Sequence, residues 1–299
     1  MTRRLYLDTS SLMYRAFFAL PDFIKDAEGK PINAVHGYLD MVARLVQSRE
    51  PDEVVHNYDH DWRPAPRVAS YSGYKAQRAP DPEGLPEQFV VLRTVLDAFG
   101  RMTQAEAEGW EAEDAIGTQV AATKGRDRAD IVTGDRDLIM LVRDPHVTLW
   151  FTRKGVTVMD RFDEAGVLDK YGVPASRYAE FAILRGDPSD GLPGVKGVGE
   201  KTARDLVLAY PSLDALIEDA NAPVRTGAPL QRSRALRASI KDAADYLRTM
   251  QEVVPIRRDL EVRSWGGEPD PKALAELAER YKLTNPIKRL TEALSVSRR

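Results

Sequence analysis

Three short apolar segments of this chain are predicted β-strands, and an aspartate directly follows each one. The segments are residues 4–7, 54–58 and 129–134, and the aspartates are Asp8, Asp59 and Asp135. Amphipathic helices are predicted between them, at residues 33–48, 86–99 and 112–122. Strands that alternate with helices indicate an α/β fold with a mainly parallel central sheet. Because the carboxyl ends of parallel strands form the ligand-binding edge of such a sheet, the aspartates are expected to meet there.

Six further acidic residues stand in short clusters. They are Glu111, Glu113 and Asp114 at a predicted helix start, Asp137 beside the third aspartate, and Asp187 with Asp190 in a later turn. Carboxylates that are brought together repel each other, and burying them unpaired costs free energy. A hard divalent cation such as Mg²⁺ removes both problems because it takes oxygen ligands. Each cluster alone is also typical of a polar turn or a helix start, but together they indicate a metal-dependent enzyme of phosphoryl transfer.

The composition is that of a globular protein with no thiol chemistry. The 299 residues suffice for one large domain or two ordinary ones. The chain has no cysteine, which excludes a disulfide framework and a thiolate site, and its four histidines show no metal-ligand spacing. The start does not resemble a signal peptide, and no apolar run approaches the roughly 20 residues of a membrane helix, so a cytoplasmic protein is expected. The net charge of −3 becomes positive without the nine clustered carboxylates, which allows a nucleic-acid partner.

Residues 60–84 are predicted to form a long excursion from the core, because they show little apolar periodicity. Aromatic and basic side chains alternate in this segment at Tyr74, Lys75 and Arg78. That mixture suits base stacking and phosphate contact. In isolation, a solvated loop with scattered tyrosines is the more ordinary interpretation.

A glycine-rich turn joins two predicted helices in the second half of the chain, at residues 177–184 and 200–210. Its glycines and lysines are Gly194, Lys196, Gly197, Gly199 and Lys201. Small residues let backbone N–H groups approach a phosphate, and the start of the following helix favours an anion. A plain helix-linking turn with solvated lysines is the alternative. The strand pattern ends at about residue 167, and a loop at 221–230 and helices at 232–250 and 271–281 are predicted to follow.

Five stretches of the chain, in the same order, resemble the bacterial 5′ nuclease family. This is the 5′→3′ exonuclease domain of DNA polymerase I, which is related to the flap endonucleases. The stretches are Asp8–Phe18, Tyr74–Arg78, Trp110–Asp114, Val132–Leu138, and Gly186–Asp190 followed by the glycine turn. The resemblance covers nearly the whole chain, and because no polymerase domain follows Arg299, a stand-alone 5′ nuclease is expected.

The resemblance implies two units. The first is an α/β nuclease core over residues 1–175, in which helices flank the sheet and a helical arch occupies about 60–100. The second is a helical DNA-binding region over residues 176–299, with a helix–three-turn–helix at about 177–210.

Family roles can be placed on matching residues of this chain. Asp8, Asp59, Glu111, Glu113 and Asp114 match one metal position, and Asp135, Asp137, Asp187 and Asp190 match a second. Tyr74, Lys75 and Arg78 match the arch, so Lys75 and Arg78 are expected to act with Asp8 in catalysis, at the scissile phosphate. Gly194, Gly197 and Gly199, flanked by Lys196 and Lys201, match the element that holds duplex DNA.

The implied function is a structure-specific 5′ nuclease of DNA replication and repair. It would act as a 5′ flap endonuclease and 5′→3′ exonuclease, including the removal of flaps or RNA primers, by a two-metal hydrolysis. The implied cofactors are two or more Mg²⁺ or Mn²⁺ ions, with a K⁺ ion in the glycine turn. The implied partner is branched or nicked double-stranded DNA with a 5′ single strand, or RNA-primed DNA, bound by a monomer without a membrane. Two alternatives stay open: a PIN-type RNA nuclease and a non-catalytic protein that binds DNA junctions.

The chain departs from the usual family pattern in a few places. The family usually has Asp at the position of Glu113, Gly at Thr9 and Asn at Gly191. Where relatives often show Arg-His-Glu before the arch, this chain has Arg67-Val68-Ala69. The position of cleavage and the metal preference are the properties that these changes affect.

Overall fold

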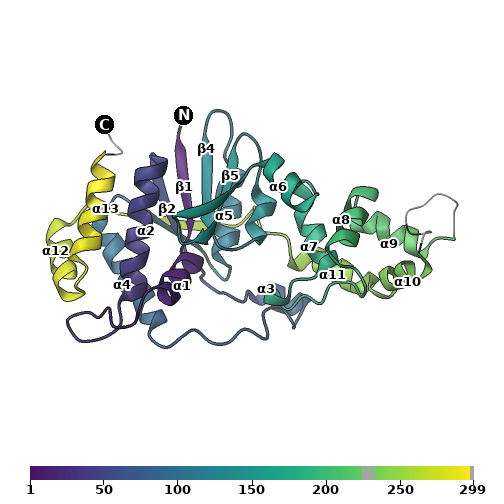
Figure 1. The fold of residues 1–299 in the computed structure, drawn as a ribbon, viewed down its shortest axis with the longest axis horizontal. Coiled ribbons are helices and arrows are strands. Elements are labelled where there is room, and N and C mark those ends of the chain that lie inside the picture. Colours follow the sequence, from purple (N-terminus) through teal and green to yellow (C-terminus); the bar gives the residue numbers. More distant parts are fainter. Residues whose placement is uncertain (224–229, 231–232, 297–299) are drawn as a thin grey trace.

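A seven-stranded mixed sheet forms the centre of the protein, in the order β6-β5-β4-β1-β2-β3-β7 (Figure 1). The computed structural model describes residues 1–223, 230 and 233–296. Its strands are β1 (Arg3–Asp8), β2 (Glu53–Asn57), β3 (Thr103–Ala107), β4 (Arg128–Thr133), β5 (Val147–Lys154), β6 (Val158–Phe162) and β7 (Val262–Trp265). The five inner strands are parallel, and the two edge strands are antiparallel to their neighbours. The prediction of a mainly parallel sheet is confirmed.

Helices cover the sheet and extend beyond one end of it. They are α1 (Thr9–Ala19), α2 (Asn33–Arg49), α3 (Ala65–Ser70), α4 (Leu85–Phe99), α5 (Ala112–Ala121), α6 (Glu164–Tyr171), α7 (Tyr178–Arg185), α8 (Glu200–Ala209), α9 (Leu213–Asn221), α10 (Arg234–Asp242), α11 (Ala244–Val253), α12 (Pro271–Arg280) and α13 (Thr284–Val296). Figure 1 shows α2, α12 and α13 beside the sheet and α7 to α11 gathered at the opposite end of an elongated molecule. No helix in the described part of the chain is long and apolar enough to span a lipid bilayer.

Each face of the sheet is buried by its own hydrophobic cluster, as a parallel sheet requires. Side chains alternate along β1, so Leu5 and Leu7 pack toward α2 and α13, while Tyr6 faces the other cluster. That second cluster continues without a break from the sheet to Phe181 in α7 and Leu206 in α8. The helical end is therefore packed continuously onto the sheet, and this packing sets where its turns lie relative to the strand ends.

The last part of the chain differs from the prediction of a helical region that runs to residue 299. After α11 the chain returns to the sheet, where β7 pairs antiparallel with β3. Helix α13 then packs against α2, and α12 against α4. Residues 262–296 thus belong physically to the α/β core. Neither of these two strands was predicted from the sequence. β3 is Thr-Gln-Ala-Glu-Ala, which is poor in β-branched residues.

Other predicted elements differ at their ends or in their continuity. The helix expected at residues 232–250 is two helices, because α10 ends at Asp242 and α11 begins at Ala244. Residues 224–229 of the predicted loop at 221–230, and residue 232, lie outside the described residues. The predicted arch region contains the short helix α3, followed by turns over residues 72–77. Tyr74, Lys75 and Arg78 therefore lie outside helices, and the helices of the expected arch region are α3 and α4.

Candidate active site

The predicted convergence of aspartates at the strand ends is present in the structure. Asp8 ends β1 opposite Asn57 at the end of β2, and β4 ends beside them at Thr133. The Asp8 carboxylate accepts hydrogen bonds from the Ser11 backbone N–H at 3.0 Å and from the Thr133 hydroxyl at 2.6 Å. Asp8 is thus also the N-cap of α1. These bonds hold the carboxylate at the edge where the three strands end.

A cleft of about 1110 Å³ opens at this edge of the sheet. Acidic and basic side chains line it together: Asp8, Asp59, Glu111, Glu113, Asp135 and Asp187, with Lys75 and Arg78. Aromatic rings of Tyr14, Trp62 and Phe89 also line the cleft. The other three predicted carboxylates contact lining residues or their neighbours. The predicted acidic and basic residues, which come from separate parts of the chain, therefore line one cavity.

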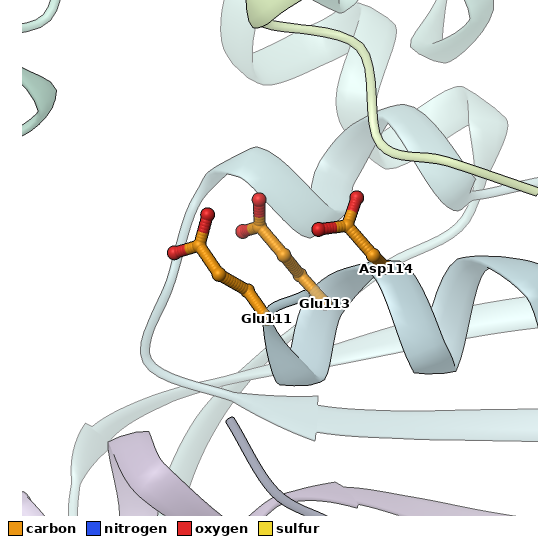
Figure 2. Close-up of side chains that lie close together, drawn as sticks. All are labelled: Glu111, Glu113 and Asp114. Atoms are coloured by element: carbon orange, nitrogen blue, oxygen red, sulfur yellow. The ribbon is translucent and has the colours of Figure 1, made fainter. Parts of the chain in front are cut away.

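The acids at the start of α5 form the tightest cluster. Glu111, Glu113 and Asp114 are all buried, and one oxygen from each lies within 4.8 Å of the others. Figure 2 shows the three carboxylates side by side, pointing to the same side of the helix. The start of α5 is also capped from outside the helix, because the Asp59 carboxylate accepts the N–H of Ala112 at 2.7 Å.

Arg67 from α3 lies against all three of these acids. Its guanidinium donates to Glu111, to Glu113 at 3.1 Å and to Asp114 at 2.8 Å. The Arg67 side chain is only 3% exposed. A planar guanidinium has five N–H donors in a fixed fork, against three on a lysine ammonium, and can satisfy several carboxylates at once. Arg67 therefore neutralises part of the cluster from inside the protein.

Glu111 has two further donors from the predicted arch. The hydroxyl of Tyr74 donates to it at 2.7 Å, and the ammonium group of Lys75 forms an ion pair with it. Tyr74 is 2% exposed, and this placement differs from its predicted role as a DNA contact. Lys75 is also buried, although it lines the cleft. In this structure Tyr74 and Lys75, which were predicted to contact DNA, both bind the carboxylate of Glu111.

The carboxylates of the first group are of two kinds, those whose pKa is lowered and those whose pKa is raised. Burial alone would raise the pKa of Glu111, but Lys75 and Arg67 outweigh it and lower that pKa. Burial and the nearby charge of Asp59 raise the pKa of Asp8 to about 7. Burial and Glu111 raise the pKa of Glu113 well above its usual value. Asp8 and Glu113 thus have too little neutralising charge around them, and a cation in the cleft would supply it.

The second group of acids lies between β4 and the turn after α7. Burial, and then the charges of Asp135, Asp190 and Asp187, raise the pKa of Asp137 well above its usual value. Asp187 is held by its own turn, where it accepts the Ser189 N–H at 2.9 Å. Asp137 is thus in electrostatic range of the other three carboxylates, whereas the tight oxygen cluster among the described residues is the one at the start of α5.

Asp190 makes the main contacts between this second group of acids and the arch residues. Arg78 donates to its carboxylate at 2.8 Å, and the ammonium of Lys75 lies 3.9 Å away. Burial still raises the pKa of Asp190. The two basic residues predicted to act on the scissile phosphate therefore both face carboxylates.

No role was predicted for Arg67 from the sequence, although it has the most contacts to the first group. It lies 44 positions before Glu111, in a stretch without apolar periodicity. One signal could have pointed to it: three acids at one helix start, with no base beside them in sequence, require a cation from elsewhere.

The glycine-rich turn lies between α7 and α8, as predicted. Gly197 has φ +76°, which favours glycine, whereas Gly199 has φ −91° and could hold any residue. At both positions a side chain would point into open space, and Lys196 and Lys201 are exposed. Gly194 is different, because it packs on the backbone of α7 and donates its N–H to the Tyr246 hydroxyl. The accessible part of the turn is therefore residues 196–201.

Comparisons with known proteins match both halves of the chain. Residues 3–172 match the model of the 5′-3′ exonuclease N-terminal resolvase-like domain, and residues 173–266 match that of the 5′-3′ exonuclease C-terminal SAM fold. A 5′-3′ exonuclease of Streptomyces coelicolor is 40% identical, over 97% of this chain and 99% of its own length. DNA polymerase I of Mycobacterium leprae is 39% identical, over 79% of this chain and 27% of its own length.

A similar fold is found in the flap endonuclease of bacteriophage T5, which was solved as a complex with DNA and metal ions. Its TM-score is 0.62 at 15% sequence identity, and the match covers 99% of this chain and all of that one. At this identity the likeness concerns the fold. It extends to the helical end as well as to the sheet.

Proposed function

The chain belongs to the 5′-3′ exonuclease family, and we propose that it is a metal-dependent, structure-specific 5′ nuclease that hydrolyses DNA phosphodiesters. The observation that carries this proposal is the cleft at the strand ends, where six of the nine predicted carboxylates line one cavity together with Lys75 and Arg78. Its substrates are 5′ flaps and nicked or branched duplexes with a 5′ single strand, including RNA-primed DNA. We place the activity in replication and repair, in the cytoplasm, and in a monomer.

Two or more Mg²⁺ or Mn²⁺ ions fit the chemistry of the cleft. Asp8, Asp59, Glu111, Glu113 and Asp114 would hold one position with oxygen ligands. The last three already pair with Arg67, and Glu111 pairs with Lys75 as well. Asp135, Asp137, Asp187 and Asp190 would hold the second. When bound there, such ions would supply activation of a water molecule and stabilisation of the leaving oxygen in an in-line displacement. A K⁺ ion in the glycine turn, bound by backbone carbonyls, is part of the same proposal.

The basic residues of the cleft would bind and orient the phosphodiester. Lys75 and Arg78 supply positive charge where the transition state gains negative charge. Arg78 is partly exposed and can turn toward a phosphate, while Lys75 reaches the cleft from its ion pair with Glu111. Tyr14, Trp62 and Phe89 offer ring faces on which bases of the 5′ strand can stack.

We also propose a division of labour along the chain. The nuclease core comprises residues 1–175 and the returning residues 262–296, while α7 to α11 hold duplex DNA through its backbone. Backbone contacts position a duplex without reading its sequence, and recognition then depends on DNA shape. This arrangement suits an enzyme that selects junctions and flaps.

A direct assay tests the proposal. A 5′-flap duplex and a matched nicked duplex, each labelled at the 5′ end, are incubated with the protein in Mg²⁺, in Mn²⁺ or in chelator, and product lengths are read on a gel. Cleavage is expected only with a divalent cation. Full activity in excess chelator would contradict the metal requirement. Binding without cleavage in Mg²⁺ would favour a junction-binding protein, and preference for a matched single-stranded RNA would favour an RNA nuclease.

Valine at position 199 is expected to weaken the binding of nicked duplex DNA by about tenfold, which is about 1.4 kcal/mol. Gly199 has a negative φ and open space around it, so the valine fits the free protein but occupies the path of an approaching phosphate backbone. The dissociation constant is measured in Ca²⁺, together with thermal stability. Gly267→Val is the matched control, since a side chain there also meets open space. A folded Gly199→Val protein with unchanged affinity would remove the turn from the DNA site.

A further inference from the structure

The arch segment, residues 71–78, lies directly on the aspartate turn, residues 187–191. The backbone N–H of Lys75 donates to the carbonyl of Asp190 at 2.9 Å, so the two segments share a main-chain hydrogen bond. Arg78 adds a second bond, from its side chain to the carboxylate of Asp190. The arch segment is thus attached to a turn that carries two of the proposed metal ligands.

Side chains of the arch segment extend this attachment at both of its ends. The hydroxyl of Tyr71 donates to the carbonyl of Gly191 at 3.1 Å. The amide of Gln77 donates to the carbonyl of Pro188 at 2.7 Å. Backbone carbonyls of the turn are therefore used as acceptors, so most of these bonds do not depend on the charge of the turn.

Gly73 and Gly191 make the closest approach between the two segments. A Cβ atom at position 191 would lie 2.4 Å from the carbonyl oxygen of Gly73, a distance that real Cβ atoms essentially never show. Gly191 also has φ +74°, in the region that favours glycine. Because backbone atoms cannot move aside as a flexible side chain can, any other residue at position 191 would separate the segments.

Lys75 depends on this attachment for its conformation. It has φ +52°, which is uncommon for a residue other than glycine, and its side chain is buried with its ammonium group on Glu111. Such a conformation persists only where the surrounding structure holds it. The bond from its N–H to Asp190 and the neighbouring contact of Gly73 supply that hold.

We propose that Gly73, Gly191 and Tyr71 are positioning residues, which fix the arch segment on the aspartate turn and so hold Lys75 and Arg78 over the carboxylates. The inference rests on the proposed nuclease function. It goes beyond that function by making the aspartate turn a support for the arch as well as a source of ligands. Since the same turn leads into the glycine-rich turn at residues 194–199, the duplex-holding element and the arch share this support.

Hydrogen exchange of backbone amides tests the attachment without any reaction. In Gly191→Ala, the amides of residues 74–78 are expected to exchange at least about tenfold faster than in the unmodified protein, because the Lys75 bond to Asp190 is broken. Gly125→Ala is the matched control, since Gly125 also has a positive φ, +63°, but meets nothing within 4 Å. Unchanged exchange of residues 74–78 in Gly191→Ala would overturn the proposal.

Cleavage kinetics test whether the attachment acts through Lys75 and Arg78. Under saturating enzyme, Gly191→Ala and Tyr71→Phe are expected to cut a 5′ flap more slowly, by about tenfold for the glycine variant, with unchanged affinity for the duplex. In a background that carries both Lys75→Ala and Arg78→Ala, the glycine substitution should change the rate by less than about twofold, because both residues that the attachment positions are then absent. Additive losses, or weaker duplex binding, would overturn the positioning role. If the unmodified protein cuts no DNA, the proposed function fails, and the exchange experiment still decides whether the contact holds the segment.

Discussion

Replacement of Asp8 by asparagine is expected to lower the single-turnover rate of flap cleavage by about a thousandfold, which is about 4 kcal/mol of transition-state stabilisation. Asp8 ends β1 in the centre of the cleft, and burial with the charge of Asp59 raises its pKa to about 7. A carboxylate in such surroundings is stabilised by a cation, and the neutral amide would lose one oxygen ligand at the position where water is activated. The rate is measured with saturating enzyme across a Mg²⁺ titration.

The same Asp8 variant should bind DNA as tightly as the unmodified protein, or more tightly. The substitution removes a negative charge that faces the phosphate backbone. Asp190→Asn is the informative comparison, because Asp190 lies at the other side of the cleft, where Arg78 and Lys75 already face it. It should retain more activity and need more Mg²⁺. Equal losses of rate in both variants, or weaker DNA binding by Asp8→Asn, would contradict two distinct metal positions.

Replacement of Arg67 by methionine is expected to lower the free energy of unfolding by about 3–5 kcal/mol at pH 7 in chelator. Methionine keeps much of the side-chain volume but leaves Glu111, Glu113 and Asp114 without their shared guanidinium. The Arg67 side chain is 3% exposed, so solvent cannot replace the lost hydrogen bonds. Equilibrium denaturation in urea measures the change, and the slope of the transition shows whether the protein still unfolds in one step.

The pH dependence of the stability of the Arg67 variant tests why this variant is less stable. Without the guanidinium, the pKa values of the three carboxyl groups should rise in the folded protein, so the folded state binds protons that the unfolded state releases. Relative to the unmodified protein, the variant then regains stability as the pH falls through the raised pKa values, so the deficit should shrink toward acidic pH. Arg153→Met is the matched control, because Arg153 is 56% exposed in its pair with Asp160. A deficit that is independent of pH would indicate lost packing rather than unpaired charge.

Much of the α/β core could be predicted from local patterns. Apolar runs that end in Asp8, Asp59 and Asp135 predicted three neighbouring parallel strands, and the register of β1 with β2 and β4 places their ends together. The glycine turn between α7 and α8 could also be predicted, because glycine spacing and helical periodicity are local properties. By contrast, β3 and β7 have weak patterns of their own. They are strands because β3 pairs with β2, and β7 pairs with β3.

The sequence by itself determined that acidic residues gather at the edge of the sheet where the parallel strands end. Strand ends and helix starts are specified by neighbours along the chain, so the acids that follow them are placed by local rules. Tertiary structure alone decided which charges meet. Arg67 and Glu111 are 44 residues apart, and Lys75 and Asp190 are further apart still. Whether a basic residue pairs with an acid in the interior or faces solvent depends on desolvation and packing across the whole fold. The spacing of residues along the sequence does not predict that balance.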